Sequence, residues 1–160
     1  MGRDAHLAHT YVPIRFVIIL IHFMFTLTVA MNPRDNVLAG IPWSKRQPYP
    51  NGGPGSEEYT ATALLTTQLA VSLCLLVLEF ALFIRPGYSI LYPLVSLSSI
   101  LLHGAGCWLT FFFLWEGWYY TFYAFILVTC VAIPAVIEIS VAASQCFSEV
   151  ELFRNIELRM

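Results

Sequence analysis

Long stretches without a charged residue most constrain what this chain can fold into. Charged residues divide the chain so that four long, apolar segments stay uncharged: 16–33, 59–78, 86–115 and 117–137. A helix needs about 20 mainly apolar residues to cross a bilayer. Soluble proteins carry about 25% charged residues, whereas only 11% of this chain is charged. The sequence therefore predicts a membrane protein.

These segments predict an all-α fold, an antiparallel four-helix transmembrane bundle that forms a single membrane domain over residues 1–160. We expect the helices at about residues 12–31, 62–84, 90–114 and 118–143. The two later connections are short, which predicts that the second, third and fourth helices are antiparallel neighbours. The apolar part of the first helix exceeds the 7–15 residues of a signal-peptide core, so we expect it to be retained.

The first connection and the tail are the parts expected outside the bilayer. Residues 32–58 contain the sequence RQPYPNGGPG, whose proline and glycine content predicts a flexible extracytoplasmic loop. Residues 144–160 are expected to form a cytoplasmic tail. With the N-terminus inside, five basic residues lie on the cytoplasmic side and three outside, which favours cytoplasmic termini. The inner set is Arg3, Arg15, Arg85, Arg154 and Arg159, and the outer set is Arg34, Lys45 and Arg46.

Ionisable residues inside the expected spans are the candidate functional residues. Glu79 and Glu138 fall at similar depth in the inner leaflet, and Arg15 is the nearest plausible counter-charge. An ionised side chain deep in a membrane helix costs roughly 3 kcal/mol on insertion scales. His22 follows Arg15 by seven residues, hence on the same helix face and deeper, and His103 falls near mid-bilayer.

Two interpretations of these five residues remain open. Either they form a polar clasp that fixes helix packing, or Glu79, Glu138, His22 and His103 form a proton or metal site. Metal sites in helical bundles use convergent ligands such as Glu-x-x-His; this chain has no such pattern, and the histidines are expected deeper than the glutamates. We therefore favour the clasp and expect no catalytic, cofactor or metal site. A net charge of −2 without a basic run argues against nucleic acid as a partner.

Three further features concern helix geometry and the outer boundary of the bilayer. Pro134 removes a backbone donor inside the last span, which predicts a kink there. Glu116 and Trp118 are expected at the outer interface, where the carboxylate stays hydrated and the indole belongs to an aromatic belt. The small residues Gly104 and Ala105 are expected to let the third helix approach a neighbour closely.

Several short pieces resemble the transmembrane protein 107 family in order and spacing. They are VPIRF before His22, EEY before the second span, VLEF around Glu79, HGAGCWLTFFFLWEGWYYTFY from His103, and Pro-Ala-Val-x-Glu ending at Glu138. Together they cover most of the chain. The chain departs from the family in its extra N-terminal residues, its longer first loop, and a tail that lacks the basic ending of animal members.

The resemblance implies a non-enzymatic membrane component of the ciliary transition zone. Such proteins belong to the Meckel-syndrome module, which builds the gate controlling ciliary membrane protein content and cilium formation. The implied partners are the lipid bilayer and other transition-zone membrane and C2-domain proteins. The alternative is a small membrane enzyme or carrier that uses Glu79 and Glu138 for proton or metal chemistry. Direct partners, oligomeric state, a bound lipid or sterol, and lipidation of Cys146 are left open by the sequence.

Overall fold

The computed structural model describes residues 2–42, 56–84 and 93–157, and over these residues the protein is all-α. Its elements are α1 (Gly2–Met31), α2 (Pro33–Gly40), α3 (Glu57–Ile84), α4 (Pro93–Glu116), α5 (Phe122–Ile126), the π-helical segment η2 (Leu127–Ala132) and α6 (Ile133–Glu157). Four stretches are long and apolar enough to cross a membrane: Thr10–Met31, Glu57–Ile84, Pro93–Glu116 and Phe122–Ser148. The predicted fold class, a four-helix transmembrane bundle, is confirmed.

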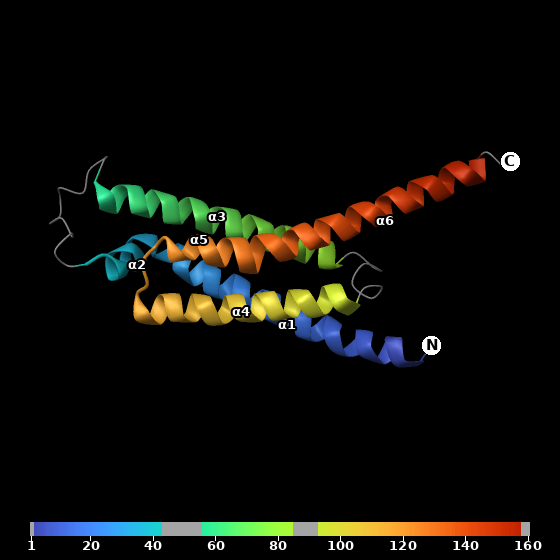
Figure 1. The fold of residues 1–160 in the computed structure, drawn as a ribbon, viewed down its shortest axis with the longest axis horizontal. Coiled ribbons are helices and arrows are strands. Elements are labelled where there is room, and N and C mark those ends of the chain that lie inside the picture. Colours follow the sequence, from blue (N-terminus) through green and yellow to red (C-terminus); the bar gives the residue numbers. More distant parts are fainter. Residues whose placement is uncertain (1, 43–55, 85–92, 158–160) are drawn as a thin grey trace.

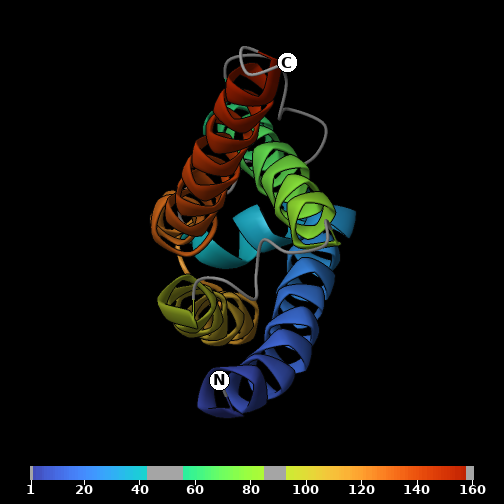
Figure 2. The ribbon, with the colours of Figure 1, turned by 90° about the vertical axis from the view of Figure 1, so that its right-hand side faces the viewer.

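The four spans run alternately up and down, and both termini lie at the same end of the bundle (Figure 1). Viewed end-on, α1 lies between α3 and α4, and the last span lies between the same two helices on the opposite side (Figure 2). The second and third spans, α3 and α4, are therefore diagonal, so the expectation that they are neighbours was wrong.

The buried face of α4 is more polar than its exposed face. The buried residues of α4 recur every three or four positions, and most are small or polar: Ser96, Ser99, His103, Gly106, Thr110 and Phe113. Exposed positions on the same helix are large and apolar, as at Leu101, Trp108 and Trp115. Polar groups between helices and apolar groups facing outward are the arrangement that a lipid solvent favours.

Two helices extend beyond the expected spans. α1 begins at Gly2, well before the expected start of the first span, so Pro13 lies inside the helix. A proline removes one backbone hydrogen bond, and the turns on either side continue the helix. α6 continues to Glu157, so the expected tail from residue 144 begins as helix. In Figure 1 this helix rises away from the other spans toward the C-terminus.

The first part of the expected flexible loop is the helix α2, which corrects that expectation for residues 33–40. Pro33 stands at its first position, where a missing N–H costs nothing. The Asn36 side chain donates to the Val29 and Asn32 carbonyls at 3.3 and 2.8 Å, at the end of α1. Val37 is buried against the core. Local capping and this apolar anchor therefore order the chain here; residues 43–55 of the expected loop lie outside the described residues.

α2 packs on the turn between α4 and α5. A Cβ atom at Gly40 would lie 2.5 Å from the Trp118 carbonyl oxygen, so only glycine allows the two backbones to approach this closely. Gly117 has φ 61°, a left-handed conformation that permits the tight turn out of α4. The end of the bundle opposite the termini is thus closed by backbone-to-backbone contact.

Candidate functional site

A buried ionic cluster lies inside the bundle, in the half nearer the two chain termini, and joins helices that are diagonally opposite. Arg15 from α1 is fully buried, and its Nη2 donates to Glu138 Oε1 from α6 on one diagonal. The same Nη2 lies 3.3 Å from Glu79 Oε1 of α3. The guanidinium carbon also lies 5.4 Å from the centre of the Phe83 ring. One cation therefore joins three of the four spans.

Glu79 joins the second diagonal to this cation. Its Oε2 lies 2.9 Å from His103 Nε2 of α4, and its Oε1 accepts a hydrogen bond from Ser99 at 3.0 Å in addition to the Arg15 contact. Both carboxylate oxygens thus face donors, which is the arrangement that an ionised carboxylate needs when it leaves water.

The two histidines continue the chain of contacts toward the middle of the bundle. His22 Nδ1 of α1 lies 2.9 Å from His103 Nδ1, and both rings are fully buried. The rings meet edge-on, with centres 5.2 Å apart and planes inclined by 62°. A continuous path of polar contacts therefore runs from Glu138 through Arg15, Glu79 and His103 to His22.

A glycine makes room for this histidine pair. A Cβ atom at Gly106 of α4 would lie 2.7 Å from His22 Nε2 and 2.9 Å from Cys130 Cβ. Gly104 has no atom within 4 Å of the same position. The close approach expected from Gly104 and Ala105 is therefore made by Gly106, which points inward while Gly104 does not.

Pro134 is buried in the last span and follows the π-helical segment η2. The Ile133 N–H donates to the Val128 carbonyl, five residues earlier, so the helix is wider where the proline lacks a donor. One further turn along, Glu138 faces Arg15. The widened turn before Pro134 is thus followed directly by Glu138, whose side chain reaches the ionic cluster.

Glu116 and Trp118 lie at the opposite end and take no part in the cluster. Glu116 is exposed, and its Oε2 accepts a hydrogen bond from Trp118 Nε1 at 2.6 Å. Tyr119 donates to Glu57 Oε1 at 3.2 Å, linking this turn to the start of α3. A hydrogen bond with Tyr120 is the main cause that raises the pKa of Tyr119 to about 12, so its hydroxyl keeps the proton that it donates.

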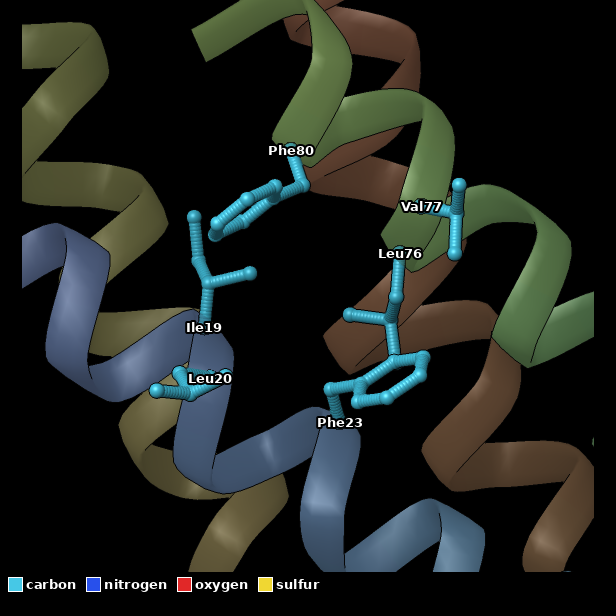
Figure 3. A pocket seen from close by; sticks show the side chains of 6 residues that line it. All are labelled: Ile19, Leu20, Phe23, Leu76, Val77 and Phe80. Carbon is cyan, nitrogen blue, oxygen red and sulfur yellow. The ribbon is translucent and has the colours of Figure 1, made fainter. Parts of the chain in front are cut away.

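An apolar groove of about 140 Å³ lies between α1 and α3, beside the cluster but separate from it (Figure 3). Its lining is Ile19, Leu20, Phe23, Leu76, Val77 and Phe80. Leu20 and Val77 are exposed on the outer surface of the bundle. In a membrane this groove faces acyl chains.

Sequence reasoning named the members of the cluster but not all of their contacts. Arg15, His22, Glu79, His103 and Glu138 are brought together, whereas Glu116, Trp118 and Pro134 are not part of the contact path. His103 was expected deeper than Glu79, yet the glutamate side chain is long enough to reach it. Ser99 and Gly106 were missed; their spacing from His103, four before and three after, places them on its helix face.

Together these features define a class of protein. It is a four-span membrane protein in which buried charged side chains from diagonally opposite helices pair with one another inside the bundle. Comparison with known proteins then gives the family. The TMEM107 family, described as "Transmembrane protein", matches residues 11–142. The chain belongs to the transmembrane protein 107 family.

Its relatives match over nearly their whole length. Transmembrane protein 107 of Xenopus laevis is 34% identical over 128 residues, which are 80% of this chain and 85% of the relative. The Homo sapiens protein of that name is 33% identical over 141 residues, 88% and 91% of the two chains. The Danio rerio protein is 29% identical over 135 residues, 84% and 93% of the two chains. No solved structure matches this chain.

Proposed function

We propose that this protein is a non-enzymatic, multi-pass component of the ciliary transition zone membrane. In this role it helps to assemble the gate that controls ciliary membrane protein content and cilium formation. The observation that carries this role is the family match over residues 11–142, a range that contains every member of the ionic cluster. Its partners are the lipid bilayer and other transition-zone membrane and C2-domain proteins.

The alternative is a small membrane enzyme or carrier that works through Glu79 and Glu138. Three donors already face the two oxygens of Glu79, from Arg15, Ser99 and His103. Glu138 is almost fully buried and faces Arg15. A carboxylate that reacts with a substrate needs a free oxygen within reach of it. The contacts therefore favour a clasp that holds the four spans in register.

Localisation tests the proposed role. In ciliated cells the tagged protein is expected to concentrate at the ciliary base, beside a basal-body marker, and to leave that position when other transition-zone proteins are removed. The tag is placed at each terminus in turn, so that a masked targeting signal is recognised. Uniform endoplasmic-reticulum or mitochondrial signal with both tags would contradict the role.

The orientation is part of the same proposal, with both termini in the cytoplasm. An even number of spans is consistent with both termini on one side of the membrane, and the excess of basic residues at the termini and in the 85–92 connection favours the cytoplasmic side. On molecules at the cell surface, tags at either terminus are expected to be digested only after the plasma membrane is opened, whereas a tag inserted in the 43–55 segment is digested in intact cells. Loss of an N-terminal tag from the mature protein would instead indicate cleavage after Ala30.

Two substitutions at Glu138 separate the clasp from chemistry. Glu138→Gln keeps the size of the side chain and its ability to accept from Arg15, so abundance and localisation are expected to stay near normal. Glu138→Leu leaves the guanidinium without this acceptor, at a cost of roughly 1–3 kcal/mol, although polar contacts in membranes often measure less. A reactive carboxylate predicts another order: both variants lose function equally while abundance and localisation stay normal. Steady-state level and position are compared in cells that lack the wild type.

A further inference from the structure

The formal charges of the buried cluster do not cancel. Arg15 contributes one positive charge, and Glu79 and Glu138 contribute two negative charges when both are ionised. All three side chains are at most a few per cent exposed. A net charge removed from water is expensive unless it is balanced. Among the residues that the structure describes around these carboxylates, the remaining ionisable partners are the two histidines.

We infer that the His22–His103 pair is a binding site for one proton, which makes the cluster electrically neutral. The geometry fixes where the hydrogens stand. Glu79 Oε2 is an acceptor, so His103 Nε2 carries a hydrogen. A single hydrogen fits in the 2.9 Å contact between the two Nδ1 atoms.

Two arrangements satisfy these contacts with any added charge on His103, the ring that contacts Glu79; a doubly protonated His22 would also fit, but its charge would lie farther from that carboxylate. In the first, both rings are neutral: His22 donates through Nδ1 to a bare His103 Nδ1, and the cluster carries one negative charge. In the second, His103 is protonated on both nitrogens and donates to both neighbours, and the cluster is neutral. His22 Nε2 has no hydrogen-bond partner among the described residues in either arrangement. The arrangements therefore differ chiefly in net charge, and the neutral one with the bound proton is the more stable.

A proton on Glu138 would also balance the charge, but its position is less favourable. It would lie against the fixed positive charge of Arg15. On His103 it lies 2.9 Å from the negative charge of Glu79. The Cys130 side chain of the last span lies near the pair, beside Gly106 and His22, and a neutral thiol adds no charge to the count. The proton is therefore held by the histidine pair.

The test uses the full-length protein in lipid nanodiscs, labelled with ¹⁵N-histidine. The chain has four histidines, and the substitutions His6→Gln and His9→Gln leave His22 and His103 as the observed pair. The sample is held at about pH 7.5, one unit above the ordinary histidine pKa of about 6.5. In an imidazolium both ring nitrogens give the resonance of a protonated nitrogen, whereas a neutral ring always shows one bare nitrogen.

The expected result is that one of the two rings is doubly protonated at this pH and the other has one bare nitrogen. The same measurement is then made on Glu138→Gln. This substitution removes one negative charge, so the charges of Arg15 and Glu79 cancel and both histidine rings are expected to be neutral. Two neutral rings in the unsubstituted cluster would overturn the inference, including the case in which Glu138 carries the proton. A doubly protonated ring that persists in Glu138→Gln would overturn the charge-balance argument. The measurement needs no ciliary partner, so it fails or succeeds independently of the proposed function.

Discussion

Replacing Arg15 with methionine is expected to produce the largest loss of stability of any single substitution in the cluster. Methionine fills a similar apolar volume but removes the cation that faces both Glu79 and Glu138. Breaking a buried ion pair by removing one partner costs about 3–5 kcal/mol because the other charge stays buried and unpaired. The thermal unfolding midpoint of the purified protein, measured in one detergent, and the steady-state level in cells are both expected to fall clearly.

Arg34→Met is the matched control. Arg34 lies 2.7 Å from Glu58, but its side chain is 49% exposed, so this pair is worth at most about 1 kcal/mol. Equal losses in the two variants would contradict the importance of the buried cation.

A double variant tests whether charge balance is the cause of the Arg15 effect. Arg15→Met combined with Glu138→Gln removes one positive and one negative charge together. The double variant is expected to be more stable than Arg15→Met alone, because the remaining Glu79 is balanced by the proton on the histidine pair. A double variant that is no more stable than the single one would show that lost packing, and not unbalanced charge, causes the damage.

Gly106→Ala is expected to have the second large effect. The added methyl group would overlap the His22 ring and lie 2.9 Å from Cys130 Cβ. His22 cannot turn aside without losing its contact with His103, so α1 and α4 must separate. Adding a methyl group to a well-packed interior costs about 1–3 kcal/mol. We expect a lower unfolding midpoint, measured under the same conditions as for Arg15→Met.

Gly104→Ala makes the same chemical change on the same helix, two residues away. No atom lies within 4 Å of its added Cβ, so stability is expected to stay unchanged or to rise slightly through better helix propensity. If the two alanine variants behave alike, the approach of α1 to α4 does not depend on Gly106.

The positions of the spans could be predicted from the sequence because they depend on a local quantity. A segment crosses the bilayer when its own residues are apolar over a sufficient length, whatever its neighbours are. The uncharged runs bounded by Arg15, Arg34, Glu79, Arg85 and Glu138 therefore indicated each span. The same runs singled out the ionisable residues that lie inside the membrane, since charge is rare there.

Which spans are neighbours could not be predicted in this way. Each span is apolar on nearly every face, so its pattern does not fix how far it is rotated toward one neighbour or another. The polar stripe of α4 is a partial exception, since Ser99, His103 and Gly106 share one face. This stripe would have indicated that Gly106, and not Gly104, lies on the buried face of α4. It would not have indicated which helix packs against that face.

The sequence by itself determined that this is a four-span membrane protein with five ionisable residues buried in its bundle. The tertiary structure decided that α3 and α4 are diagonal, that Arg15 pairs with both glutamates, and that Glu79 reaches His103. It also decided that residues 33–40 form a helix, because Val37 and Asn36 find partners on neighbouring elements. The physical reason is the same in each case: a contact between segments depends on the rotation and approach of both, whereas insertion into lipid depends on each segment alone.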